Sequence, residues 1–176
     1  MDRDWETDMS NLRLINETSG TSVSSVDITD VFTSDFDIYK ISGVGNFSNT
    51  NRFIYFRFIN NSGSVVSASN YDYANLVMES YTSFGESRST NADHIERLVY
   101  STNGDDFGFE IYVFNPNNSN SYTFALYQSS GRSSLGLVSV KSIAVLKQQA
   151  QMGGIKIYNA DFTDISVRTY GLRVDS

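Results

Sequence analysis

The sequence predicts an all-β protein, and more narrowly a two-layer antiparallel β-sandwich that is jelly-roll-like. Twelve Phe, eleven Tyr and one Trp make the chain 14% aromatic, and rings favour pleated sheets. Short apolar segments alternate with turns rich in Asn, Ser and Gly, as in sandwiches and barrels. With a single proline, the turns depend on residues that reach turn geometry by their own chemistry. Roughly ten to twelve such segments are too many for one open sheet, so we expect two stacked layers.

The first half of the chain supplies four predicted strands and one ambiguous segment. Residues 1–10 lack a strand pattern and are interpreted as an N-terminal arm. The predicted strands cover residues 11–16, the segment around Val23, Val26 and Ile28 after a Ser-rich turn, residues 36–41, and residues 53–59. The last of these is apolar on both faces, which predicts a central strand covered on both sides. Residues 71–80 combine a weak helical period with a strand-like setting, and a short window does not decide between them.

The second half contains the strongest turn signal. Asn103-Gly104 separates residues 95–100 from residues 107–113, and Asn-Gly between apolar strands predicts a hairpin. Residues 122–127 form a natural antiparallel partner for residues 107–113. Further predicted strands cover residues 135–146, 155–158 and 165–174. No repeat or linker interrupts them, so residues 11–176 are predicted to form a single β-sandwich domain.

Composition excludes several classes of function. The chain has no cysteine and one histidine, His94, so neither a disulfide nor a zinc site with two imidazoles is expected. No apolar run approaches the ~20 residues of a membrane span, so no membrane insertion is expected. The thirteen Lys and Arg are scattered in a chain of net charge −7, which disfavours nucleic acid as a partner. The first residues lack the charged and apolar regions of a signal peptide.

Catalysis and bound ions find little support. Four acids, Glu79, Glu86, Glu96 and Glu110, are candidates for a paired-carboxylate glycosidase, but their spacing singles out no pair. His94 lies in a polar turn without a nucleophile elbow, which favours a surface histidine. Asn103, Asp105 and Asp106 offer oxygen ligands to calcium but not a full ligand set. We therefore expect a protein that is not an enzyme and uses no cofactor or metal.

Aromatic residues provide the candidate contact sites. Trp5 is a lone ring in a charged arm; it either packs on its own sandwich or forms a subunit or particle interface. Tyr71, Tyr73 and Asn75 are candidate glycan contacts, because sugar binding uses flat rings beside planar polar groups. The alternative for the tyrosines is ordinary covering of a strand edge, with their hydroxyl groups in water.

Three stretches resemble β-sandwich virion proteins of tailed bacteriophages, especially phages of marine bacteria. The resemblance covers most of residues 35–173 and does not extend to residues 1–20. Residues 159–163 and 168–172 depart from the Gly-rich turn and the Leu-Tyr-Gly-Ile ending that such proteins usually have. The stretches read DFDIYKI (35–41) with FIYFRF (53–58) and SNYDYA (69–74); EIYVFNP (110–116) with SYTF (121–124); and GIKIY (154–158) with ISVRTYGL (165–172).

The resemblance implies an accessory structural component of the virion, assembled in the host cytoplasm. Its expected partners are copies of itself in a homo-oligomer and other capsid or tail proteins on the particle exterior. Capsid decoration or a head-fibre base is preferred over a tail adaptor or tail fibre, because a fibre usually needs a long repetitive shaft. The alternative function is a carbohydrate-binding module of a phage appendage that recognises a host surface glycan.

Overall fold

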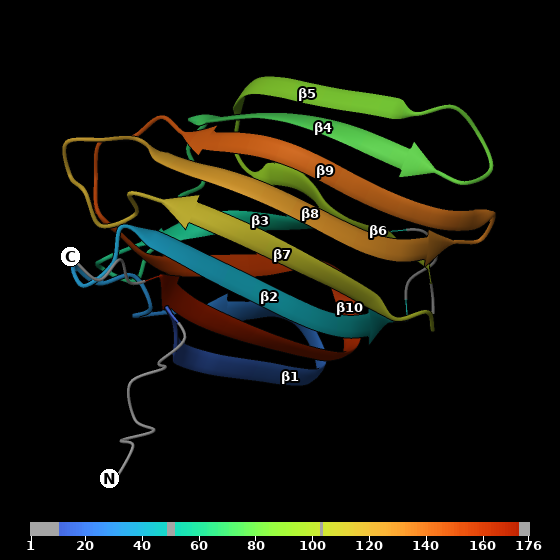
Figure 1. The fold of residues 1–176 in the computed structure, drawn as a ribbon, viewed down its shortest axis with the longest axis horizontal. Coiled ribbons are helices and arrows are strands. Elements are labelled where there is room, and N and C mark those ends of the chain that lie inside the picture. Colours follow the sequence, from blue (N-terminus) through green and yellow to red (C-terminus); the bar gives the residue numbers. More distant parts are fainter. Residues whose placement is uncertain (1–10, 49–51, 103, 173–176) are drawn as a thin grey trace, which may run out of the picture.

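The computed structural model describes residues 11–48, 52–102 and 104–172 (Figure 1). These residues form strands and connecting loops without any helix, so no helix among them could cross a membrane. The arm at residues 1–10, with Trp5, and the end of the last predicted strand lie outside the described residues. The strands are β1 (Leu12–Ile28), β2 (Ile38–Phe47), β3 (Arg52–Asn60), β4 (Tyr71–Glu79), β5 (Gly85–Ala92), β6 (Ile95–Ser101), β7 (Phe107–Phe114), β8 (Thr123–Ser133), β9 (Gly136–Leu146) and β10 (Met152–Leu172).

The strands form a two-layer antiparallel β-sandwich, as the alternating sequence pattern predicts. All pairings between the strands are antiparallel. What we call the large sheet has the order β5-β4-β9-β8-β7-β2-β10-β1 and uses residues 162–172 of β10. The small sheet has the order β6-β3-β10-β1 and uses residues 152–158 of β10. β6 packs across the interior against β8 and β9, which closes the sandwich on that side.

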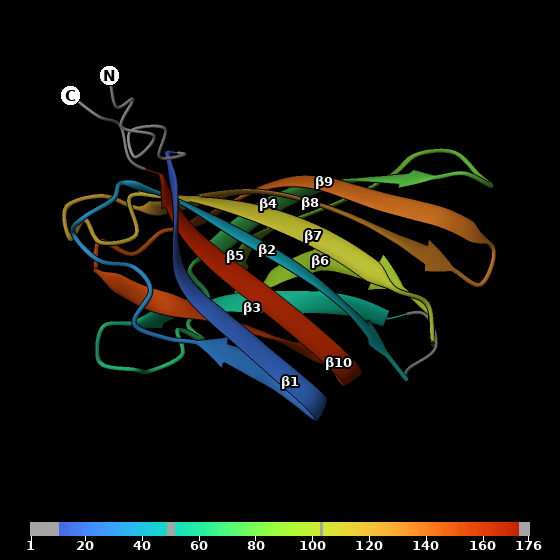
Figure 2. The same cartoon turned by 60° about the horizontal axis from the view of Figure 1, so that its bottom comes forward.

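Strands β1 and β10 belong to both layers, because each bends where the register between them shifts. Opposite β1, the pairing jumps from Phe162 to Tyr158, which leaves three residues of β10 outside the ladder. Within them Asn159 has a φ of 78°, and its side-chain amide donates to the Phe53 carbonyl over 2.9 Å. Asn tolerates this left-handed backbone better than most residues. Figure 2 shows the β1–β10 pair running along one side of the sandwich.

The core lies between the two layers and is rich in rings. Phe56 of β3 meets Tyr127 of β8 edge-to-face, with ring centroids 5.4 Å apart. Phe58 stacks near Tyr71 of β4 at 6.4 Å. All four of these side chains are at most 2% exposed. Burial of apolar side chains between the layers is the main stabilising contribution in such a domain, at about 25 cal/mol per Å² of apolar surface removed from water.

Several connections differ from the sequence-based expectations. The Asn-Gly turn at residues 103–104 does not close a hairpin, because β6 pairs with β3 whereas β7 pairs with β2 and β8. Gly104 keeps the positive φ typical of such turns, 74°, but it carries the chain from the small sheet to the large one. The predicted Ser-rich turn inside residues 12–28 is continuous strand, and residues 155–158 and 165–172 belong to one bent strand.

The sequence does not predict β5, because its residues GESRSTNA show no apolar alternation. In the structure, β5 pairs with the edge of β4 through backbone hydrogen bonds.

The burial of β3 also differs from the expectation. β3 lies between β10 and β6, but no third layer covers its outward face, so Phe53, Tyr55 and Arg57 are half-buried there. The ambiguous segment at residues 71–80 forms β4, and the expected antiparallel pairing of residues 107–113 with 122–127 is confirmed.

Candidate binding surface on the outer face of the large sheet

The outer face of the large sheet carries side chains in rows that run across the strands. Residues directly opposite each other in an antiparallel ladder point to the same face, so the registers define each row. The row nearest the start of β8 contains only apolar residues from six neighbouring strands. We call it the apolar row; in strand order it consists of Leu12, Leu172, Ile38, Phe114, Phe124 and Val145.

The next two rows become progressively more polar. What we call the mixed row combines rings, aliphatic residues and Lys40. What we call the polar row is hydrophilic over its first six strands. The mixed row is Leu14, Tyr170, Lys40, Tyr112, Leu126, Ile143, Ala74 and Arg88; the polar row is Glu17, Arg168, Ser42, Glu110, Gln128 and Lys141, followed by Leu76 and Glu86. The face therefore changes from apolar to polar along the strands.

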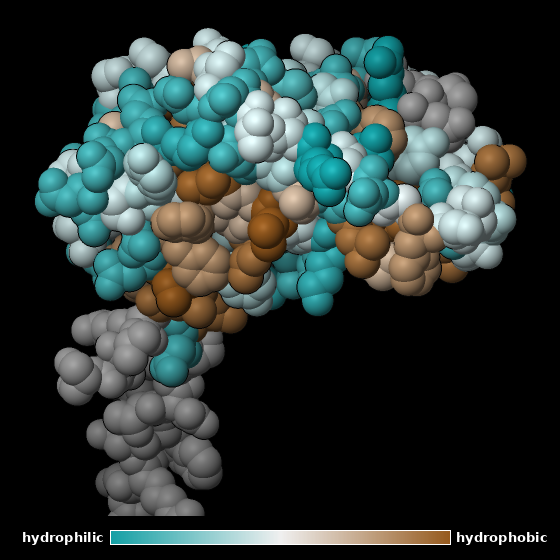
Figure 3. All heavy atoms as spheres, turned by 90° about the horizontal axis from the view of Figure 1, so that it is seen from above, coloured by the Kyte–Doolittle hydropathy of each residue, from teal (hydrophilic) through white to brown (hydrophobic). Residues whose placement is uncertain are grey.

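The apolar end of this face is exposed. The exposed fractions of the side chains are 45% for Phe124, 47% for Leu126 and 58% for Ile143. Together with Phe114 and Val145 they line a depression of about 830 Å³. Figure 3, viewed onto the β5 edge, shows a largely polar upper surface and apolar side chains gathered along its lower side. A contiguous apolar patch of this kind is typical of a contact surface.

In the polar part of the face, ion pairs join charged side chains on neighbouring strands. The Lys40 ammonium lies 2.7 Å from the Glu110 carboxylate on the neighbouring strand. This hydrogen bond, more than any other influence, raises the pKa of Lys40 above its ordinary value. Arg168 donates to Glu17 over 2.8 Å. A second depression, of about 510 Å³, lies beside these groups and is lined by Ser42, Glu110 and Arg168, among others.

The three predicted glycan contacts on β4 point into the sandwich. Tyr71 is fully buried, and its hydroxyl donates to the Val66 carbonyl over 2.9 Å. Asn75 is 4% exposed and accepts a hydrogen bond from Tyr127 at 2.6 Å. Tyr71 and Asn75 thus present no surface to a glycan on the outside of the molecule. The cause is strand parity, because in β4 the odd-numbered residues face inward and Asp72, Ala74 and Leu76 face outward.

Tyr73 is half-buried, and its side chain also points into the sandwich. Its hydroxyl donates to the Glu96 carboxylate over 2.8 Å. Burial, aided by this carboxylate, raises the pKa of Tyr73 to about 12. The Asn75 amide and the Tyr127 hydroxyl both reach the backbone carbonyl of Glu96. These contacts join β4 and β8 of the large sheet to β6 of the small sheet, a structural role that explains their polar side chains.

Two of the four candidate acids share a row, but they lie too far apart to form a catalytic pair. Glu86 and Glu110 share the polar row but are four strands apart, or roughly 19 Å; a glycosidase pair needs at most ~9.5 Å. Glu79 accepts a hydrogen bond from Tyr81 over 2.6 Å, and Glu96 accepts one from Tyr73. Glu86 and Glu110 are therefore too far apart to act as acid and base on either side of one bond.

The candidate calcium loop is occupied by protein contacts. Asp105 pairs with Arg132 at 3.1 Å, and Asp106 accepts a hydrogen bond from Asn46 over 3.3 Å. Asn103 lies outside the described residues. Within the part of the chain that the structure describes, no three His, Asp or Glu side chains gather closely enough to hold a metal ion.

The opposite face, on the small sheet, is covered by rings and cations. His94 stacks on Tyr55 at 4.5 Å, and its Nδ1 lies 2.5 Å from Asp93. The hydrogen bond with His94, followed by Coulombic attraction from His94 and Arg57, lowers the pKa of Asp93. Arg57 binds the same carboxylate at 2.5 Å and lies over the Tyr158 ring. These groups satisfy one another and cover an otherwise open sheet.

Comparisons with known proteins give no family. No protein-family model matches the chain, and no curated protein matches it. Solved structures with some likeness include a single mutant of congerin II (TM-score 0.35, 12% identity, 82% of this chain and 98% of the other). An alginate lyase from Aplysia kurodai has a TM-score of 0.33 and 8% identity over 90% of this chain and 82% of its own. The CBM2 module of the evolved Dit of Lactobacillus casei BL23 phage J-1 has a TM-score of 0.28 and 9% identity, over 86% and 70%. TM-scores below 0.5 do not transfer a function to this chain.

Proposed function

We propose that this chain is a non-catalytic structural component of a tailed-phage particle that assembles through the apolar end of its large sheet. One observation carries the proposal. The apolar row, continued by Leu126 and Ile143, crosses six strands on an exposed face, and every member lacks a side-chain hydrogen-bonding group. Such a surface is best covered by the apolar side chains of another protein.

The occupant that this surface suits is a second copy of the chain. The six residues of the apolar row carry no charge, and Asp72, which continues the row on β4, is paired with Lys147 at 2.8 Å. Two copies can therefore meet at the apolar row without bringing unpaired like charges together, although each carries a net charge of −7. Because both partners use the same patch, the contact is symmetric, and the apolar row of each copy is covered by that of the other. Phe124 lies between Phe114 and Val145 in the row and beside Leu126, so it is surrounded by apolar neighbours, and a large side chain in such a setting contributes strongly to an interface.

The phage assignment is supported by the sequence resemblance. Two of the resembling stretches, residues 35–41 and 110–116, lie largely in β2 and β7, at the centre of the large sheet. A third contributes residues 165–172 of β10, which pair with β2. The separation of Glu86 and Glu110 supports a role without catalysis. The proposed location is the exterior of the particle, with capsid decoration or a head-fibre base preferred.

The assembly proposal is tested by Phe124→Asp. Placing a charge in the apolar row is expected to weaken self-association by about 2 kcal/mol or more, or roughly thirtyfold. Sedimentation equilibrium should show an oligomer for the unchanged protein and a monomer for the variant at the same concentration. Melting should be little affected, because the side chain is 45% exposed in the isolated chain.

The matched control is Leu135→Asp. Leu135 is 73% exposed beyond the opposite end of β8, and its substitution should leave the oligomer intact. A protein that is monomeric at all concentrations, or an oligomer insensitive to Phe124→Asp, would contradict the proposed interface. Antibody labelling of purified particles then distinguishes head from tail, and absence of the chain from those particles contradicts the virion role.

A further inference from the structure

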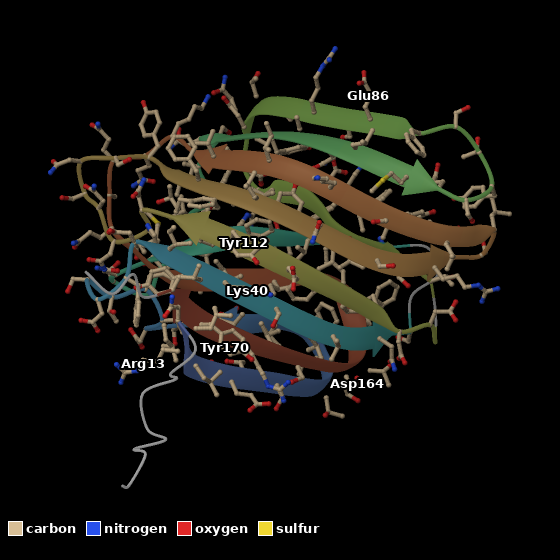
Figure 4. The ribbon with its side chains drawn as sticks, in the orientation of Figure 1. Arg13, Lys40, Glu86, Tyr112, Asp164 and Tyr170 are labelled. Carbon is tan, nitrogen blue, oxygen red and sulfur yellow. The ribbon has the colours of Figure 1, made fainter. Side chains whose placement is uncertain are left out.

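We propose that the middle of the same outer face is a binding site for a neutral, linear oligosaccharide, centred on Tyr170, Lys40 and Tyr112. These three residues are direct neighbours in the mixed row, on β10, β2 and β7. Figure 4 shows them side by side on the face that is toward the viewer. This site goes beyond the proposed assembly function, since it uses a different part of the face and a different class of ligand.

The two tyrosines supply the platforms that a sugar chain needs. Each is half-buried, so part of each ring remains in solvent. They are separated by two strand spacings, or about 10 Å, with Lys40 between them. The Lys40 ammonium lies 5.8 Å from the centroid of the Tyr112 ring and fixes the ring by a cation–π contact. The apolar C–H faces of successive sugar rings can pack on such fixed platforms.

The neighbouring polar row supplies hydrogen-bonding groups at the same strands. Arg168, Glu110 and Gln128 present planar groups next to Tyr170, Tyr112 and Leu126, respectively, and Ser42 lies between the first two. Planar groups can bind two adjacent hydroxyls at once. The amide of Gln128 has no hydrogen-bond partner among the described residues and is free to bind a ligand. All four residues line the depression of about 510 Å³, which lies on the side of the polar row away from the tyrosines and continues toward Val44 and Ser130.

The charges beside the two tyrosines are paired, which favours a neutral ligand, whereas Lys141, which has no ion-pair partner among the described residues, lies two strands from Tyr112. Lys40 is compensated by Glu110 at 2.7 Å, and Arg168 by Glu17 at 2.8 Å. Both cations are therefore hydrogen-bond donors with little net field, while the chain as a whole is negative. An anionic polymer would be repelled at long range and would have to displace these ion pairs. A neutral glycan can bind to them as they stand.

The test is calorimetric titration of the full chain with neutral linear oligosaccharides of glucose, galactose and mannose, with oligogalacturonate as the anionic comparison. At least one neutral oligosaccharide should bind, whereas oligogalacturonate should not. Tyr112→Ala should weaken that binding about tenfold or more, and Gln128→Ala should weaken it to a smaller extent. The affinity should change little when salt is raised to about 1 M, because no net charge is neutralised.

The matched control is Tyr122→Ala. Tyr122 is 42% exposed in the loop before β8 and lies outside all three rows, so its removal should leave binding unchanged. Circular dichroism of each variant checks that the sheet is intact. Absence of binding by every neutral oligosaccharide, binding that survives Tyr112→Ala, or a salt-sensitive preference for oligogalacturonate would each overturn the proposal. Failure of this titration leaves the assembly proposal standing, since self-association is measured without sugar.

Discussion

Replacing Gly154 by alanine is expected to prevent stable folding. A Cβ at this position would overlap the backbone carbonyl oxygen of Ile28, at the end of the β1–β10 ladder, where Ile28 pairs with Ile155. The obstacle is backbone, and it cannot rotate away as a side chain would. The preceding Gly153 carbonyl accepts hydrogen bonds from the amides of Val31 and Phe32, so the loop after β1 also holds this segment in place.

The expected loss is more than about 4 kcal/mol, which is a large part of the stability of an ordinary domain. It is measured as the loss of soluble protein or of the cooperative urea transition. Gly108→Ala is the control, because a Cβ there meets nothing closer than the Gly43 carbonyl at 3.9 Å. If Gly154→Ala melts like the unchanged protein, the close approach of Gly154 to the Ile28 carbonyl is wrong.

Phe56→Ala is expected to destabilise the sandwich by about 3–5 kcal/mol. Phe56 is fully buried between the layers, where it contacts Tyr127 of the opposite sheet and Phe58 of its own strand. Its removal leaves a cavity that the rigid sheets can fill only in part. Urea unfolding should show a lower midpoint with an unchanged slope.

The contrasting variant is Phe84→Ala. Phe84 is 68% exposed in the connection between β4 and β5, so its loss should change stability by about 0.5 kcal/mol or less. Equal effects of the two substitutions would mean that Phe56 does not lie between two packed layers.

Most of the sandwich is predictable from period-two alternation. β7 shows this well, since Phe107, Phe109, Ile111 and Val113 alternate with half-buried residues in the sequence and in the structure. β5 cannot be predicted in this way, because its sequence has no apolar alternation. An edge strand can be held by backbone hydrogen bonds alone. The bends of β1 and β10 are not predictable from alternation either. Asn159 is typical of a turn in sequence, but in the structure its positive φ lets β10 bend from one layer into the other.

The candidate site is harder to predict because parity alone does not say which face is buried. In β4 both faces contain plausible ring or apolar residues, and the inward set proved to include Tyr71, Tyr73 and Asn75. The rows on the outer face depend on registers between strands far apart in sequence, such as Lys40 with Tyr170. Local patterns contain no information about these registers. The alternation in β7 does place Tyr112 on the face opposite Phe107, Phe109, Ile111 and Val113, but it does not show that Lys40 lies beside it.

The outer face of the large sheet is the proposed working surface, and hydroxyl-radical footprinting of the assembled protein against the Phe124→Asp variant tests this most directly. In the assembly, Phe114, Leu126 and Val145 should become protected from oxidation. The half-exposed rings of the small sheet, Phe53, Tyr55 and Tyr100, should be oxidised equally in both samples. Protection of those three rings, with the apolar row oxidised to the same extent in both samples, would show that the opposite face makes the contact.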